Sequence, residues 1–314
     1  MSRHTASRAL ALVIAVALGP LTSHAARAQD LEPRAYATLP VGLNFALAGY
    51  AYSVGGIATD PALPLDDAHL DVDVSFLAYA RSLDVLGRSA KVDFAVPYAW
   101  LSGSATYQGE PIRRVVDGFA DPSARFSMNL VGGPALSPSE FASYDEDLVV
   151  GASARLSIPL GRYDSERLVN IGTHRWAVKP EIGVVKSWGR LQLELASGVS
   201  IYSSNPDFFG GKHRDQAPIF AQQAHLLVRI VRGVFVAADA TYYSGGRTTV
   251  DGVEKDDALS NARLGGTVVV PLSPDYSLKV YGSSGLWTRF GSDFDTVGAA
   301  LQYRWTDAAP NVVP

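Results

Sequence analysis

The feature that most constrains the fold is an alternation of apolar and polar side chains, with a period of two residues, that recurs along most of the chain. In the segment 297–305 every odd-numbered residue is apolar or aromatic, whereas Gln302 and Arg304 are among the even-numbered ones. A period of two is the pattern of a β-strand whose two faces meet different surroundings. The recurrence of this pattern predicts an all-β protein.

Twelve segments carry the alternation: 41–52, 70–81, 91–100, 124–130, 148–158, 176–186, 191–201, 219–231, 234–243, 262–272, 276–287 and 297–305. Most are about ten residues long, which is the length that a tilted strand needs to cross the hydrocarbon layer. Strands of soluble proteins are usually about five or six residues long. We therefore predict a transmembrane antiparallel up-and-down β-barrel of about twelve strands.

The links between these segments alternate in length. Those at 85–88, 188–189, 232–233 and 273–275 are tight, and the links after the first, third, fifth, seventh and ninth segments are longer and polar. Short periplasmic turns and long external loops are typical of outer-membrane barrels. Two links depart from the rule, because 132–145 is long and 291–293 is short.

Aromatic residues gather near the ends of the segments, where membrane barrels carry interfacial girdles. The predicted outer girdle includes Trp100, Tyr202 and Tyr243, and the predicted periplasmic girdle includes Tyr303 and Trp305. The alternative is that a strand-rich protein simply contains many aromatic residues.

The N-terminal segment resembles an export signal. Arg3 and Arg8 precede an apolar run of about ten residues, and the small-x-small sequence at 26–28 follows. The run is too short to span a bilayer as a helix. We predict a signal peptide at 1–28, a periplasmic segment at 29–40, the barrel at 41–306 and a tail at 307–314. The alternative is the apolar helix start of a cytosolic domain.

Charge and cysteine content exclude other classes. From residue 29 onward, 24 basic residues stand against 31 acidic ones, which argues against a nucleic-acid partner. The chain has no cysteine, so an exported form cannot be held together by disulfides. A closed barrel needs none, because every strand edge is paired. A secreted β-sandwich is the remaining all-β alternative.

In a membrane barrel the polar faces enclose the lumen. The charged residues that we expect to line the lumen or a solute path are Asp73, Arg81, Asp93, Arg125, Arg155, Lys179, Glu181, His225, Arg229, Asp239, Lys279 and Arg304; Lys91, Glu194 and Arg263 share this face. One interpretation is that these charges pair and hold the barrel together. The other is that some of them set the selectivity of a pore.

Phe208 and Phe209, between polar residues and glycines, are the best candidates for contact with an apolar solute in a loop. The alternative is that the two rings pack this loop onto the rim. No catalytic motif and no histidine pair at metal-ligand spacing occurs after residue 28, so we predict no enzyme, no metal and no cofactor. A membrane-embedded hydrolase would need a serine, a histidine and a carboxylate on one face.

Several motifs are similar to those of a known family. They are Gly42-Leu43-Asn44-Phe45, Gly49-Tyr50-Ala51-Tyr52, the run 168–176, Phe208-Phe209-Gly210-Gly211, the run 241–248 and the run 291–295. Together they resemble the proteins named for the meta-cleavage pathway of phenol degradation. This resemblance implies an outer-membrane protein that moves aromatic compounds, and it carries over no catalytic residues.

The function that we predict is an outer-membrane channel or transporter for small solutes, with aromatic compounds such as phenol-pathway substrates among them. The alternative is a structural or adhesive outer-membrane barrel with a plugged lumen. The expected partners are the lipid bilayer and a small-molecule solute, and the sequence does not specify an oligomeric state.

Overall fold

A computed structural model describes residues 33–58, 65–107 and 109–307; the predicted signal peptide lies outside these residues. The described strands are β1 (Leu43–Ala58), β2 (Leu65–Val85), β3 (Arg88–Tyr107), β4 (Glu110–Phe119), β5 (Ser123–Val131), β6 (Leu148–Ser157), β7 (Ala177–Trp188), β8 (Leu191–Tyr202), β9 (Asn205–Phe208), β10 (Lys212–Gln216), β11 (Ile219–Val231), β12 (Val234–Gly245), β13 (Thr248–Val250), β14 (Val253–Glu254), β15 (Leu259–Pro271), β16 (Tyr276–Trp287) and β17 (Gly291–Thr306). One short helix, α2 (Pro138–Phe141), follows β5.

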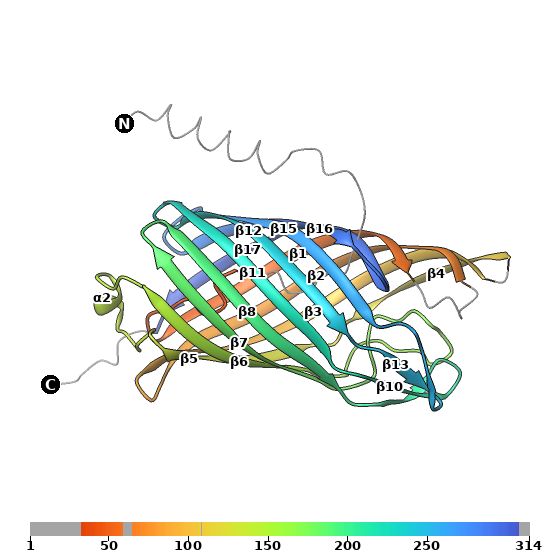
Figure 1. The fold of residues 1–314 in the computed structure, drawn as a ribbon. Coiled ribbons are helices and arrows are strands. Elements are labelled where there is room, and N and C mark those ends of the chain that lie inside the picture. Colours follow the sequence, from red (N-terminus) through yellow and green to blue (C-terminus); the bar gives the residue numbers. More distant parts are fainter. Residues whose placement is uncertain (1–32, 59–64, 108, 308–314) are drawn as a thin grey trace.

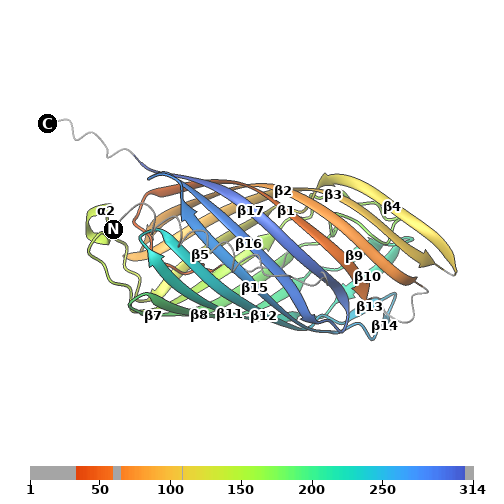
Figure 2. The same ribbon diagram turned by 90° about the horizontal axis from the view of Figure 1, so that it is seen from above.

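Thirteen of the described strands form one antiparallel sheet that closes on itself (Figures 1 and 2). Closure comes from β1, which pairs with both β2 and β17, and from the pairing of β2 with β3. β4 and β5 pair with two successive stretches of β3. Together they therefore occupy one strand position in the barrel wall, and we call such a position a stave. Counted in this way, the described sheet is a barrel of twelve staves, which confirms the predicted fold.

The links also follow the predicted asymmetry. One end of the barrel has tight turns at 86–87, 189–190 and 232–233, and the same end carries α2 in the long link 132–147 (Figure 1). We call it the periplasmic end. The opposite, outer end carries the long links 158–176, 203–218 and 246–258, and β9, β10, β13 and β14 form a small separate sheet there.

Two predicted loops are wrong. In the link after the first segment, β1 continues to Ala58 and β2 already begins at Leu65. The polar, glycine-rich stretch after Trp100 is mostly strand, because β3 and β4 continue as a hairpin that extends beyond their neighbours (Figure 1). β2 and β3 are 21 and 20 residues long, about twice the length needed to cross the hydrocarbon layer.

Apolar side chains cover the outside of the barrel. Among them, Leu77 is 67% exposed and Val297 is 55% exposed, as expected for side chains that meet lipid. About half of the buried residues are polar, and those on the inner face include Asn129, Gln192 and Thr241. No helix in the described part of the chain is long and apolar enough to cross a membrane.

Aromatic rings gather at both ends of the outer face. At the periplasmic end the ring of Tyr303 lies 4.9 Å from Tyr276 and 5.3 Å from Trp305, and at the outer end Tyr98 lies 4.8 Å from Trp100. Two predicted girdle members are wrong. Tyr243 is buried inside opposite Ala221, and Tyr202 lies on the inner face beneath Arg175.

Candidate functional site

A ladder of charges crosses the inner wall on four neighbouring strands. The register places Arg125 beside Asp93 and Arg155, and it places Arg155 beside Lys179. Arg125 Nε lies 2.9 Å from Asp93 Oδ2, and Lys179 Nζ lies 2.9 Å from Glu181 Oε2. Five predicted lumen residues are therefore brought together. Two of the three cations are paired with the two carboxylates, so the five side chains together leave a net charge of +1 on this part of the inner wall.

A second inner cluster joins β8, β11, β12 and β15. His225 Nδ1 lies 2.6 Å from Asp239 Oδ1, and the hydroxyl of Thr267 donates to Asp239 Oδ2 at 2.9 Å. The register places Glu194 beside His225, and all four side chains are buried. Such a polar network is stable inside a barrel only when its members are paired.

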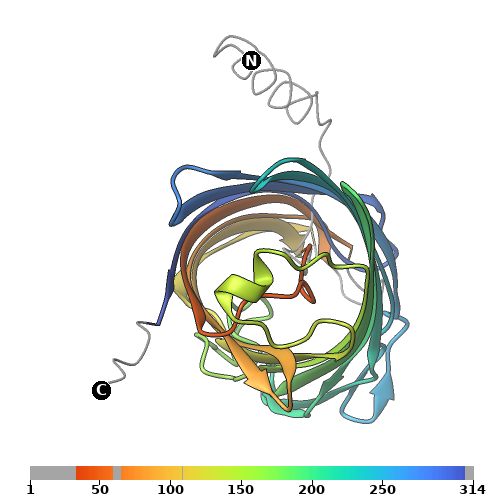
Figure 3. The same ribbon diagram turned by 90° about the vertical axis from the view of Figure 1, so that its left-hand side faces the viewer.

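The segment 33–42 enters the barrel. The sequence predicts only a periplasmic segment at 29–40, but the described part of it crosses the inside of the periplasmic end (Figure 3). Tyr36 is 3% exposed, and its hydroxyl donates to Glu181 Oε1 at 2.8 Å. The backbone N–H of Arg34 donates to Glu194 Oε2 at 2.6 Å. The segment is thus bonded to both charged clusters of the wall.

Two glycines make room for the Tyr36 ring. A Cβ built on Gly151 would lie 2.4 Å from Tyr36 Cδ1, and one built on Gly183 would lie 2.2 Å from Tyr36 Cε2. Both glycines are on the inner face, next to each other on β6 and β7. A cavity of about 20 Å³ remains beside this ring, lined by Ala35 and the charge ladder; it has room for about one water molecule.

The long link 132–147 covers the periplasmic mouth and holds the same segment. Val41 N–H donates to the carbonyl of Leu136 at 2.8 Å, and Thr38 N–H donates to Glu146 Oε2 at 2.8 Å. A capping box starts α2, in which hydrogen bonds from Ser137 lower the pKa of the Glu140 carboxyl. This link is long because it serves as part of the inner closure rather than as a tight turn.

Three other predicted residues lie on the inner-face register without joining the clusters. Arg229 and Arg304 lie at the periplasmic rim, where they donate to the turn carbonyls of Gly189 and Pro274 at 2.8 Å each. Lys279 lies over the ring of Tyr281, with Nζ 5.4 Å from its centroid. Whether any inner residue lines a solute path stays a prediction.

The prediction that Asp73 and Arg81 line the lumen is wrong. On β2, Asp73 pairs with Tyr52 of β1 and Arg81 pairs with Asn44. Tyr52 and Asn44 in turn pair with Val297 and Trp305 of β17, which face outward. Asp73 accepts a hydrogen bond from Tyr50 on this outer face.

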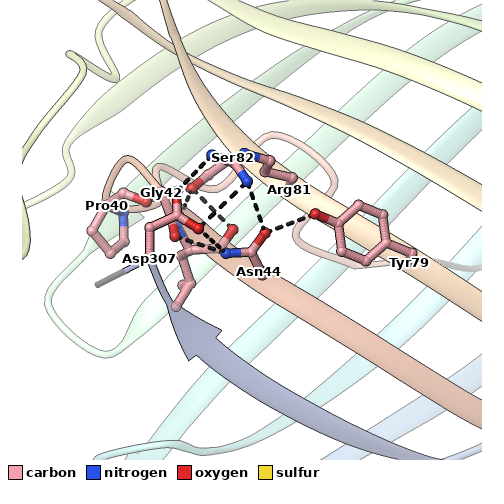
Figure 4. Close-up of polar contacts among 8 residues, drawn as sticks. Pro40, Gly42, Asn44, Tyr79, Arg81, Ser82 and Asp307 are labelled. Carbon is pink, nitrogen blue, oxygen red and sulfur yellow. Dashed lines mark hydrogen bonds and ion pairs between the residues drawn. The ribbon is translucent and has the colours of Figure 1, made fainter. Parts of the chain in front are cut away.

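Arg81 instead binds Asp307, the residue that follows β17 (Figure 4). Arg81 Nη2 lies 2.5 Å from Asp307 Oδ2, and Asn44 Nδ2 donates to Asp307 Oδ1 at 3.0 Å. The hydroxyl of Tyr79 donates to Asn44 Oδ1 at 2.7 Å. The group lies on the seam where the first strand meets the last, and its role is structural.

An apolar cluster lies inside the outer half of the barrel. Leu70, Leu101, Val116 and Phe294 form a buried cluster, against which Val169 and Ile171 of the link 158–176 pack. Beyond it lies a cavity of about 600 Å³, lined by Arg114, Gly161, Arg162, Tyr163, Asp164, Ser165, His174 and Asp207. Sequence reasoning missed these residues, although 168–176 stood out as a motif.

Phe208 and Phe209 do not line this cavity. The guanidinium of Arg214 lies 4.9 Å from the ring centroid of Phe208, and Phe209 is 36% exposed at the rim. Contact of the two rings with a solute stays a prediction. In the described part of the chain, no three histidine, aspartate or glutamate side chains are grouped in a way that could hold a metal ion.

Comparisons with known proteins agree with this architecture. A family model described as "Putative MetA-pathway of phenol degradation" matches residues 49–305. The structure is similar to an outer membrane channel from Pseudomonas putida F1, with a TM-score of 0.73 and 18% identity over 88% of this chain and 100% of that chain. It is also similar to the transport unit of the autotransporter AIDA-I from Escherichia coli, with a TM-score of 0.50 and 9% identity over 94% of this chain and 97% of that chain. No curated protein matches the sequence.

Proposed function

The chain belongs to the family of the MetA-pathway of phenol degradation, and from this premise we propose that it is a channel for small solutes in the Gram-negative outer membrane. The exposed apolar side chains on the outer face of the barrel support contact with a lipid bilayer. On this proposal a signal peptide at 1–28 exports the chain, the barrel is not an enzyme, and lipid turnover by the purified protein would contradict it.

The observation that carries the proposal is the nature of the obstruction in the lumen. The periplasmic half is filled by the segment 33–42 and the outer half by part of the link 158–176. Eight-stranded barrels are filled by their own wall side chains, whereas barrels of sixteen or more strands leave an aqueous channel. A barrel of twelve staves lies between these limits, so a path would open when both segments move aside, and removal of one of them would lower the obstruction.

Aromatic compounds such as phenol-pathway substrates are the solutes that the family description favours. The apolar cluster around Phe294 would contact an uncharged ring that passes the outer half. The charge ladder at Arg125 and Arg155 would favour small anions in the inner half.

A structural or adhesive barrel is the second candidate. The segment 33–42, which we call the plug, favours it because the plug is hydrogen-bonded inside the barrel. Tyr36, Arg34 and Thr38 each make a hydrogen bond with a carboxylate of the wall or of the link 132–147. If these bonds never open, the lumen conducts nothing and only the external loops act.

Solute flux into proteoliposomes distinguishes the two candidates. We expect liposomes that contain the barrel from residue 29 onward to swell in small sugars, and liposomes that contain a variant lacking 33–41 to swell faster. Heat-modifiable gel migration would verify that both forms are folded. Folded protein that admits no solute in either form would overturn the channel proposal, and Tyr36→Ala provides a second, milder opening of the plug.

A further inference from the structure

The cavity at the outer mouth has the size of a small-molecule site. Its volume of about 600 Å³ lies within the usual range for ligand pockets. It is bounded by the inner face of β4, by the link 158–176 and by Asp207 of β9. Val116, two residues from Arg114 on the same face of β4, belongs to the apolar cluster beneath it. A solute that comes from outside would therefore meet this cavity before it meets the apolar cluster.

Among the residues that the structure describes, none supplies an anionic partner for Arg114, a cation of this cavity. It is half-buried, and its Nε donates to the carbonyl of Val169 at 3.4 Å. Within the described residues its two terminal nitrogens make no hydrogen bond, and no carboxylate lies within 4.0 Å of them. The guanidinium fork therefore keeps the donors with which arginine binds a planar carboxylate in a bidentate manner.

Tyr163 and His174 form a stacked aromatic pair, and the outer face of this pair offers a platform for a ligand ring. Their ring centroids lie 4.7 Å apart, with an angle of 18° between the planes. Asn205 is 2% exposed; its Nδ2 donates to the Tyr163 hydroxyl at 3.0 Å, and its Oδ1 accepts from His174 Nδ1 at 3.2 Å. Because one buried amide fixes both rings, the platform is set before a ligand arrives, which lowers the entropy cost of binding.

The other charges that line the cavity do not cancel Arg114. Arg162 donates to the carbonyl of Asp117 at 2.6 Å, and its carboxylate lies 3.9 Å away. Asp164 accepts from the backbone N–H of Glu166 at 3.0 Å. Asp207 is exposed at the rim, where water screens its charge more than it screens the half-buried Arg114.

We propose that this cavity binds monocyclic aromatic carboxylates, with the carboxylate on Arg114 and the ring against Tyr163 and His174. The inference rests on the proposed channel function and narrows its solutes to one chemical class. The cavity would concentrate such acids at the outer mouth, next to the apolar cluster. Arg114, Tyr163 and His174 are the specificity-determining residues on this assignment.

Equilibrium binding of three matched probes to the full barrel in detergent tests the assignment. The probes are benzoate, its uncharged isostere benzamide, and the non-aromatic acid cyclohexanecarboxylate, all at neutral pH. We expect benzoate to bind tightest. Benzamide should bind about ten- to a hundredfold more weakly, the range for loss of a hydrogen bond to a charged group. Equal binding of benzoate and benzamide, or no binding of any probe, would overturn the proposal.

Variants of adjacent arginines provide a matched comparison. Arg114→Gln should remove the preference for benzoate over benzamide, and Arg114→Lys should restore part of it. Arg113→Gln makes the same change of charge one residue away, on the opposite face of β4, and should leave the preference intact. Tyr163→Leu should remove the preference for benzoate over cyclohexanecarboxylate. An equal loss with Arg113→Gln would show that general surface charge, not this site, attracts the acid.

The binding readout separates this site from the channel itself. If proteoliposomes admit solutes but the barrel binds no benzoate, the channel proposal stands and the binding site is rejected. Binding that depends on Arg114, in a barrel that admits nothing, would keep the site and reject the channel.

Discussion

The hydroxyl of Tyr36 donates to Glu181 Oε1 at 2.8 Å, and this bond fastens the segment 33–42 to the same carboxylate that pairs with Lys179. The plug and the charge ladder thus share one wall residue. A change that moves Tyr36 would therefore alter both the opening of the lumen and the charges exposed within it.

Gly183→Ala should release the plug, although the substitution itself removes no polar group. Its new Cβ would lie 2.2 Å from Tyr36 Cε2, so the ring must move by more than an ångström. We expect higher conductance in planar bilayers and faster tryptic cleavage after Arg34. Gly266→Ala is the control, because the nearest atom to its Cβ would be Ala237 O at 3.5 Å on the outward register. Unchanged conductance with Gly183→Ala would argue that Tyr36 does not hold the lumen closed.

Sequence alternation located all twelve staves, because the hydrocarbon layer imposes apolar outer faces wherever a strand crosses it. It assigned the wrong face on β2. There the apolar Leu70 and Phe76 face inward, Leu70 in the buried cluster and Phe76 over Gly49. Asp73 faces outward and accepts a hydrogen bond from Tyr50. The rule that apolar means outward is therefore inverted along this segment, because its apolar side chains fill the inside of the barrel, and for this reason Asp73 was assigned to the wrong face.

The plug and the outer cavity left weaker traces in the sequence. The segment 33–42 is not periodic, and the only sign of Tyr36 in the wall is the pair of inner glycines, Gly151 and Gly183. Arg114 lies in a stretch whose glycines and polar residues resemble a loop. The apolar and polar alternation of a strand does not predict contacts that depend on how a link folds back into the barrel.

Asp239→Ala should be among the most destabilising changes on the wall. It leaves the buried His225 and Thr267 without the carboxylate that accepts from them, and loss of such a buried partner costs about 2–4 kcal/mol. The free energy of unfolding in urea, with the barrel in lipid vesicles, measures it. Asp73→Ala, which removes a carboxylate from the outer face, should cost less than about 1 kcal/mol. Similar costs for both variants would contradict the buried network.

Arg155→Ala should shift the ion selectivity of the open lumen toward cations. Arg155 is the middle member of the row Arg125, Arg155 and Lys179, and rings or rows of cations favour anions in a pore. The reversal potential under a KCl gradient measures the shift, best in a variant that lacks 33–41. Arg81→Ala removes the same charge from the outer face and should leave the reversal potential unchanged.

Asn44→Ala should weaken the barrel seam more than Arg81→Ala, although only Arg81 is charged. Asn44 is 1% exposed, and its loss leaves the Tyr79 hydroxyl and Asp307 short of partners, at a cost of about 1–3 kcal/mol. The Arg81 and Asp307 side chains are 40% and 45% exposed, so water screens their ion pair to at most about 1 kcal/mol. Urea unfolding of both variants compares them directly. If the order is reversed, the ion pair rather than the buried amide holds the last strand to the first.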